Sequence, residues 1–257
     1  MLELQHIHKY YNPGTINEMC LFEDFNITVE DGQFVSVVGS NGSGKTSLLN
    51  LICGSIGLDS GRVLIDGKNI TNDKEYKRNQ YIGRVFQNPA MGTCPNMTIA
   101  ENMSLADNKG KFYGLRAGKK KDRMDYYRDS LKKLSLGLED KMDVKVGVLS
   151  GGQRQAMALL MSTLTPIRFL ILDEHTAALD PKTAELIMQL TDKIVKEKKL
   201  TTIMVTHNLR YAVDYGNRLV MMHQGRAVMD YAGDEKDKIE IDRILDKFNE
   251  ISIECGN

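Results

Sequence analysis

The 257-residue chain has no excess of charge of either sign, because 34 Lys and Arg residues balance 34 Asp and Glu residues. A neutral chain lacks the broad basic surface that binds nucleic acid or an anionic membrane. Cysteine is also scarce, and Cys20, Cys53, Cys94 and Cys255 show neither CxxC nor Cys/His spacing. This pattern argues against a disulfide framework or a zinc site and favours reduced thiols in a cytosolic protein.

Long hydrophobic runs are missing as well. The most apolar stretch, residues 156–172, is interrupted by Pro166 and Arg168 and is too short to span a bilayer. Residues 1–6 are polar and typical of a strand, so we expect no signal peptide. These absences predict a chain that reaches a membrane only through partner subunits.

Internal repeats and low-complexity linkers are absent, and short apolar runs alternate with amphipathic segments. The predicted strands are 2–7, 22–29, 34–38, 63–65, 81–86, 169–172, 201–205 and 219–222. The predicted helices are 45–53, a helix opening at Thr98, 119–136, 151–164, 181–198 and 239–248. We therefore expect an α/β fold in which a helical subdomain, 88–165, is inserted into a core formed by 1–87 and 166–257.

One segment is rich in basic residues, namely Lys109, Lys111, Arg116, Lys119, Lys120, Lys121 and Arg123. A solvated helical face is one interpretation of this cluster. Contact with a protein partner or with lipid headgroups is the other.

A glycine-rich loop follows the apolar strand 34–38 and precedes the predicted helix 45–53. Its sequence, Gly39-Ser40-Asn41-Gly42-Ser43-Gly44-Lys45-Thr46, matches the pattern G-x₄-G-K-T in full, and Ser47 completes the predicted nucleotide-binding set. Glycines let the backbone approach phosphates closely, and successive N–H groups with a helix N-terminus form a positive concavity. We expect Lys45 to contact the β- and γ-phosphates of a nucleotide and Thr46 to offer its hydroxyl to Mg²⁺.

An acidic pair, Asp173-Glu174, ends the apolar run 169–172. Read alone, such a pair is as consistent with a solvated strand end as with catalysis. With the glycine-rich loop present, Asp173 is predicted to hold Mg²⁺ through its water shell and Glu174 to activate or orient the attacking water.

A third motif, Leu149-Ser150-Gly151-Gly152-Gln153-Arg154-Gln155, lies between the other two. The three motifs in this order resemble the ATP-binding cassette family, and the resemblance covers nearly the whole chain. It implies a P-loop NTPase core of the RecA-like type with an antiparallel β subdomain and an inserted α-helical subdomain.

The resemblance also implies that ATP is shared between two subunits. Residues Leu149 to Gln153, Ser150 and Gly152 above all, are implied to contact the γ-phosphate of the ATP bound by the opposite subunit. A Ser hydroxyl, glycine N–H groups and a helix N-terminus form a second anion site, which fits this role. Two head-to-tail subunits then enclose two ATPs, and Asp180, in Ala177-Ala178-Leu179-Asp180, belongs to the loop that crosses the interface.

Three further positions match family residues one by one. Gln87 resembles the glutamine that contacts Mg²⁺ and the attacking water, and His207 resembles the histidine that contacts the γ-phosphate. Tyr11 lies where the family has an aromatic residue that stacks on adenine, with Tyr10 as the competing candidate.

The chain departs from the family pattern in two places. His175 follows Glu174 where many members have proline, and residues 12–18 lengthen the first hairpin. Together these features resemble a subset of bacterial stand-alone ATPase subunits whose neighbours are a permease and a substrate-binding lipoprotein. Some of that subset are assigned to tryptophan or tyrosine uptake.

The resemblance implies an ATPase that uses ATP and Mg²⁺ and drives a membrane transporter, with an importer of a small solute such as an amino acid as the first hypothesis. Its expected partners are a second identical or paralogous subunit, integral-membrane permease subunits and an extracytoplasmic substrate-binding protein, but no nucleic acid. Its expected location is the cytoplasmic face of the cell membrane. The alternatives are a soluble ATPase acting on nucleic acid or ribosomes, an exporter or lipoprotein-release ATPase, and a small-molecule kinase, which would not need the third motif.

Overall fold

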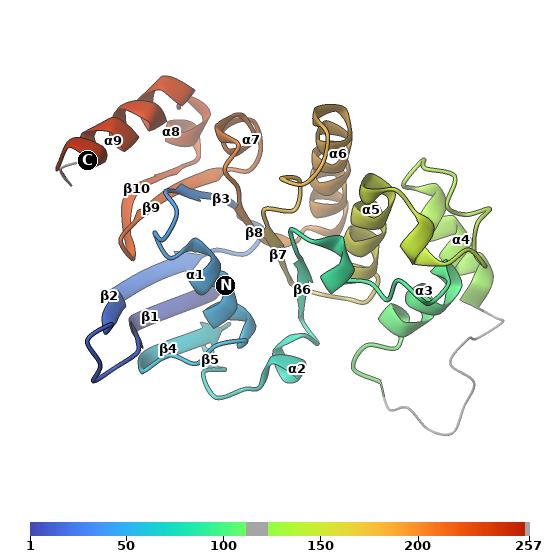
Figure 1. Cartoon of the computed structure of the whole chain (residues 1–257), viewed down its shortest axis with the longest axis horizontal. Helices are drawn as coiled ribbons and strands as arrows, with labels where there is room; N and C mark the ends of the chain where they lie inside the picture. The colour runs from blue at the N-terminus through green and yellow to red at the C-terminus, as the bar shows by residue number, and fades with distance from the viewer. Residues whose placement is uncertain (112–122, 255–257) are drawn as a thin grey trace. The chain divides into compact units, whose positions relative to one another are not determined.

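The computed structural model describes residues 1–111 and 123–254, and the chain divides into two compact units. The first unit combines Met1–Arg78 with the residues from Leu200 onward, and the second unit is Asn79–Lys199. Antiparallel strands, parallel strands and helices are all present (Figure 1), so the predicted α/β fold is confirmed. The helical segment 88–165 shares the second unit with strands and a long helix, and its status as a separate subdomain stays a prediction.

The first unit begins with an antiparallel sheet of four strands in the order β2-β1-β4-β5. These strands are β1 (Leu2–Tyr11), β2 (Met19–Val29), β4 (Ser60–Ile65) and β5 (Lys68–Asn69). The register of β1 shifts between Leu4 and Ile7, where His6 has a φ of 50°. This β-bulge explains why the apolar alternation of the sequence slips at His6.

The same unit contains the parallel strands that carry the glycine-rich loop. Strand β3 (Phe34–Gly39) pairs in parallel with β8 (Thr201–Val205) on one side and β9 (Arg218–His223) on the other. Strand β10 (Arg226–Ala232) pairs antiparallel with β9 and was not predicted. It is an edge strand in which only Met229 is buried, so the sequence shows no apolar alternation there.

The helices of the first unit are α1 (Lys45–Cys53), α2 (Glu75–Arg78), α7 (Leu209–Asp214), α8 (Asp234–Asp237) and α9 (Ile241–Glu254). Helix α9 lies along the β9–β10 hairpin (Figure 1), and its Ile244 and Ile251 join Met221 and Met229 in one buried cluster. Helix α9 was predicted over 239–248 but spans Ile241–Glu254, and Ile239 packs in the same cluster ahead of the helix.

The second unit is mainly helical around one pair of parallel strands. Strands β6 (Ile82–Val85) and β7 (Phe169–Asp173) pair in parallel. The helices are α3 (Ile99–Asp107), α4 (Met124–Lys132), α5 (Gly151–Ser162) and α6 (Pro181–Lys198), with short 3₁₀ turns η1 (Pro89–Met91) and η3 (Val146–Val148). The predicted capping box at Thr98 and Glu101 is present.

The basic cluster lies partly outside the described residues, which exclude Arg116 and Lys119 to Lys121. Its described members bind within the chain: Lys109 donates to the carbonyl of Ile82, while Lys111 and Arg123 pair with Asp107. Within the described ranges, no helix combines the length and apolar character needed to cross a membrane.

Candidate functional site

The glycine-rich loop leaves the carboxyl end of β3 and enters α1 at Lys45. The Lys45 ammonium lies inside the loop, where it donates to the carbonyls of Gly39 and Ser40 at 2.8 Å each. Because the side chain is buried, its charge is held within the loop that the sequence predicts to bind phosphate.

Two glycines make this loop geometry possible. Gly39 has a φ of 152°, and a Cβ there would lie 2.2 Å from the carbonyl oxygen of Met222 on β9. Gly225, in the turn between β9 and β10, donates its N–H to Ser43 of the loop. A Cβ on Gly225 would lie 1.6 Å from the carbonyl oxygen of Leu21, so the hairpin turn and the loop support each other only with glycine at both places.

The loop presents polar groups that fit an anion. Helix α1 has Gly44 as its N-cap, so no side chain caps its first turn. The hydroxyl oxygen of Ser43 is buried and, among the residues that the structure describes, finds no hydrogen-bond partner. Uncapped amides at a helix N-terminus beside a buried cation are the features that bind phosphate.

The two tyrosines at the end of β1 differ in their surroundings. The Tyr11 hydroxyl lies 3.2 Å from that of Ser47 in the first turn of α1, while Tyr10 pairs with Cys20 on β2 and binds Asp59 through its N–H. The geometry therefore brings Tyr11 to the loop and gives Tyr10 other partners.

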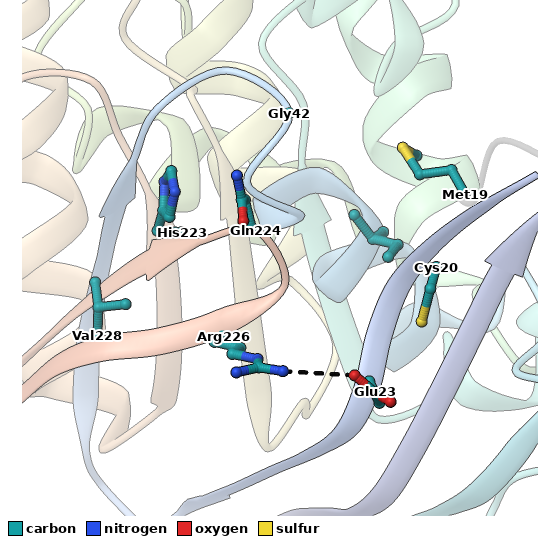
Figure 2. Close-up of a pocket in the computed structure, with 9 residues that line it drawn as sticks. Met19, Cys20, Glu23, Gly42, His223, Gln224, Arg226 and Val228 are labelled. Atoms are coloured by element: carbon teal, nitrogen blue, oxygen red, sulfur yellow. Dashed lines mark hydrogen bonds and ion pairs between the residues drawn. The ribbon is translucent and has the colours of Figure 1, made fainter. Parts of the chain in front are cut away.

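A pocket of about 650 Å³ adjoins the loop in the same unit. Figure 2 shows Gly42 at its edge, Met19 and Cys20 from the start of β2 on one side, and the β9–β10 hairpin on the other. Its polar groups include an exposed ion pair between Arg226 and Glu23, at 3.4 Å. Of the predicted nucleotide-binding residues, only Gly42 lines this pocket, and Tyr11 does not.

His207 follows β8 in the first unit. Because β8 runs parallel to β3, with Val205 opposite Val37, the residues after both strands share one edge of the sheet. His207 is exposed at that edge, and Asn208 beside it caps helix α7.

The second unit gathers three more predicted residues at one strand edge. Val85 of β6 lies opposite Leu172 of β7, so Gln87 and the pair Asp173-Glu174 all follow the carboxyl ends of adjacent parallel strands. Gln87 is exposed, whereas Asp173 and Glu174 are half-buried. Carboxylate, amide and hydroxyl oxygens are ligands that Mg²⁺ accepts, so Asp173, Gln87 and Thr46 fit this ion by their chemistry.

The backbone at Glu174 has an unusual conformation, with a φ of 47°. The next residue, His175, is buried and its Nε2 lies 3.2 Å from the hydroxyl of Thr191 on α6. That hydroxyl donates to the carbonyl of Ile187, so it accepts a hydrogen from His175 Nε2. Burial lowers the pKa of His175 to about 4, and the neutral imidazole therefore anchors the residue after Glu174 to α6.

The third motif forms the start of α5. Ser150 is the N-cap, its hydroxyl accepts from the N–H of Gln153, and the Gln153 side chain accepts from the N–H of Ser150. Leu149 is buried, whereas Ser150 is exposed and the glycines that follow are half-buried. A Cβ on Gly152 would lie 2.2 Å from the Thr183 methyl group of α6, so this glycine also serves packing within the chain.

Asp180 also has a structural role. It caps α6 by accepting from the N–H of Thr183, and hydrogen bonding from Thr183 lowers the pKa of Asp180. It remains exposed and is thus accessible to a partner subunit.

Two polar residues near these positions belong to none of the sequence motifs. Arg84 of β6 donates to a carboxylate oxygen of Asp173 at 2.8 Å. Gln155, buried in α5, donates to the carbonyl of Phe86, the residue before Gln87. A charged residue inside the apolar strand 81–86 was a visible signal for Arg84, but its partner depends on strand pairing and cannot be found from spacing alone.

Known proteins resemble this chain over most of its length. The family model described as ABC transporter matches residues 22–177. A tyrosine transport ATP-binding protein of Clostridioides difficile (strain R20291) is 49% identical over 253 residues, which cover 96% of this chain and 98% of that protein. A spermidine/putrescine import ATP-binding protein of Haemophilus influenzae (strain ATCC 51907 / DSM 11121 / KW20 / Rd) is 34% identical, with 90% of this chain and 57% of that protein covered.

Solved structures agree with these relatives. A dimeric ATP-binding cassette in a post-hydrolysis state, bound to ADP and phosphate, matches with a TM-score of 0.76 and 31% identity, covering 90% of this chain and 98% of that one. The family model covers more than half of the chain, and the Clostridioides relative aligns along nearly the whole length of both proteins. The chain therefore belongs to the ABC transporter family, as an ATP-binding subunit that hydrolyses ATP.

Proposed function

We propose that this chain is the ATPase subunit of an amino-acid importer and that tyrosine or a related aromatic amino acid is the transported solute. The observation that carries the proposal is the 49% identity to the tyrosine transport ATP-binding protein along almost the full length of both chains. The spermidine/putrescine relative is named for import, which supports this direction of transport.

The first unit supplies the groups that hold the nucleotide. Lys45 exchanges its carbonyl contacts for the β- and γ-phosphates, and the uncapped amides of α1 with the Ser43 hydroxyl bind the remaining phosphate oxygens. Residues Gly39 to Ser47 form this cradle, and Tyr11 stacks on the adenine. His207 contacts the γ-phosphate from the neighbouring strand.

Most of the groups that act on metal and water belong to the second unit, and Thr46 belongs to the first. Thr46, Gln87 and Asp173 are the oxygen donors for Mg²⁺, which when bound neutralises charge on the phosphates. Glu174 orients the attacking water, and the buried neutral His175 keeps the backbone of Glu174 in place. Asp173 is half-buried at the end of β7, where Arg84 donates to one of its carboxylate oxygens.

A second subunit completes the site. Leu149, Ser150, Gly151, Gly152 and Gln153 of one subunit cover the γ-phosphate held by the other, with Asp180 beside the interface. The exposed N-terminus of α5 suits this role, because its N-cap hydroxyl and first amides favour an anion. The solved dimeric cassette with ADP and phosphate supports this arrangement.

The further partners are permease subunits and an extracytoplasmic substrate-binding protein, which place the chain on the inner face of the membrane. Nucleic acid is not a partner in this proposal, because the chain has no net positive charge. ATPase activity that nucleic acid stimulates would favour the alternative function.

Uptake of radiolabelled amino acids by cells of the source organism tests the proposal. A chromosomal Lys45→Ala substitution should abolish tyrosine uptake while the protein stays at its normal level, because the phosphate cradle loses its cation. Lys68→Ala, an exposed lysine on β5, is the matched control and should transport normally. Unchanged uptake of tyrosine, phenylalanine and tryptophan in the Lys45→Ala strain would refute the substrate class.

A further inference from the structure

Strand β6 carries one charged side chain, Arg84, in an otherwise apolar run, and this side chain contacts Asp173, a predicted metal ligand. Arg84 Nη2 donates to Asp173 Oδ2 at 2.8 Å, and the two side chains are only 10% and 13% exposed. The guanidinium also lies over the Phe86 ring, 4.6 Å from its centroid. None of the three motifs of the sequence uses this arginine.

The surroundings hold the arginine in this position. Strand pairing sets Arg84 opposite Ile171, so its side chain reaches along β6 to the carboxylate two residues further on β7. Arg84 Nε is buried and has no hydrogen-bond acceptor within the described part of the chain. The Asp173 carboxylate is therefore its principal electrostatic partner, and no other cation in the described ranges lies within ion-pair distance of Asp173.

We infer that Arg84 is a built-in counter-ion that competes with the metal for Asp173, so that Asp173 takes up Mg²⁺ only together with the nucleotide. The inference rests on the proposed role of Asp173 as a metal ligand. A cation at 2.8 Å from one carboxylate oxygen already neutralises the charge that would attract Mg²⁺, and it repels a second cation in a partly buried site.

Arg84 has two opposing effects on the affinity of Asp173 for Mg²⁺, and the larger effect decides whether the affinity rises or falls. The ion pair restrains the carboxylate, which would assist metal binding. Asp, however, has only two side-chain torsions and stands at the end of a paired strand, so little freedom remains to be lost. The repulsion between a guanidinium and a divalent ion a few ångströms apart is the larger effect. The triphosphate of ATP brings the negative charge that overcomes it.

Binding of Mn²⁺, a paramagnetic substitute for Mg²⁺, to the nucleotide-free protein tests the inference by electron paramagnetic resonance. Arg84→Met should bind Mn²⁺ at least tenfold more tightly than wild type. Arg218→Met is the matched control, because it makes the same change of charge in the Arg218–Asp230 pair of the β9–β10 hairpin. This variant should bind Mn²⁺ with the affinity of wild type. Equal Mn²⁺ affinity of Arg84→Met and wild type would overturn the inference.

Further variants separate the possible failures. Thermal unfolding will report whether Arg84→Met folds normally. If it does not, Arg84→Gln, which removes the charge but keeps a hydrogen-bond donor, should show the same gain in Mn²⁺ affinity. Adding Asp173→Asn to either variant should abolish the gain, and a gain that persists would overturn the inference. Asp173→Asn alone tests the metal role of Asp173, because this variant should lose the part of its ATP affinity that depends on Mg²⁺. If that part of the affinity persists, the proposed role of Asp173 as a metal ligand is refuted.

Discussion

Individual residues explain what holds the glycine-rich loop in its shape. Lys45 is satisfied by two carbonyls of its own loop, and Gly225 of the distant β9–β10 turn bonds to Ser43. The loop was predictable from its motif, but the support from Gly225 was not, because the contact joins residues far apart in the sequence. The local sequence Gln224-Gly225 is typical of a turn and carries no sign of the contact with the loop.

Gly225→Ala tests this support. The substitution imposes a positive φ of 72° on alanine and drives a Cβ into the Leu21 carbonyl. We expect urea unfolding to show a loss of about 2–3 kcal/mol beyond that of the control, the usual cost of overpacking, together with weaker ATP binding. Gly67→Ala is the matched control, because Gly67 has a similar φ of 73° with no atom within 4 Å of the added Cβ. Equal losses in the two variants would contradict the contact.

The buried imidazole of His175 predicts a pH dependence of stability. Its pKa falls from 6.5 to about 4 in the folded protein because burial disfavours the charged form. The unfolded protein therefore binds a proton at His175 more readily than the folded protein does. The free energy of unfolding is unaffected by this group above pH 6.5 and falls by an amount on the order of 3 kcal/mol as the pH falls from 6.5 toward 4.

The control for this prediction is His175→Gln, which keeps a donor for the Thr191 hydroxyl but does not titrate. Urea unfolding at several pH values should show a shallower loss of stability for the variant in that window. The variant keeps every carboxylate of the chain, so parallel curves would mean that His175 is not the group responsible.

At the scale of elements, the N-terminus of helix α5 has a structural role and a proposed functional role. Ser150 caps the helix, and the same exposed N-terminus is proposed to meet the γ-phosphate of the partner's ATP. Ser150→Ala should cost about 1 kcal/mol of stability because the cap is lost. Ser150→Asp keeps the cap but places a negative charge at the anion site, so it should preserve stability and lower the ATPase rate at least tenfold. A normal rate in Ser150→Asp would contradict the second anion site.

The elements that sequence predicted well are those whose signals are local. Helix α1 spans Lys45–Cys53 and strand β8 spans Thr201–Val205, both as predicted, because a loop motif and a short apolar run mark their ends. Strand β10 was missed because its stability comes from pairing with β9 rather than from apolar alternation. For the same reason the motifs identified Asp173, while Arg84 emerged only from the pairing of β6 with β7.

At the scale of the whole molecule, the predicted ATP-handling residues are divided between the two units. The glycine-rich loop and His207 belong to the first unit, whereas Gln87, Asp173, Glu174 and the N-terminus of α5 belong to the second. The proposed cycle uses predicted residues of both units and the α5 N-terminus of a second subunit. We therefore expect dimerisation to depend on intact ATP.

Glu174→Gln separates ATP binding from hydrolysis and so tests that requirement. The amide keeps the size of the side chain but cannot activate water, so bound ATP should persist. The protein should then accumulate as a dimer with Mg-ATP, which light scattering after size exclusion will measure. Glu197→Gln, the same charge change at an exposed position of α6, should stay as monomeric as wild type. Adding Lys45→Ala to Glu174→Gln should restore the monomer, because the phosphate cradle then loses its cation. If Glu174→Gln instead dimerises no more than Glu197→Gln, hydrolysis does not control the dimer, and the proposed coupling between ATP and the transport cycle is wrong.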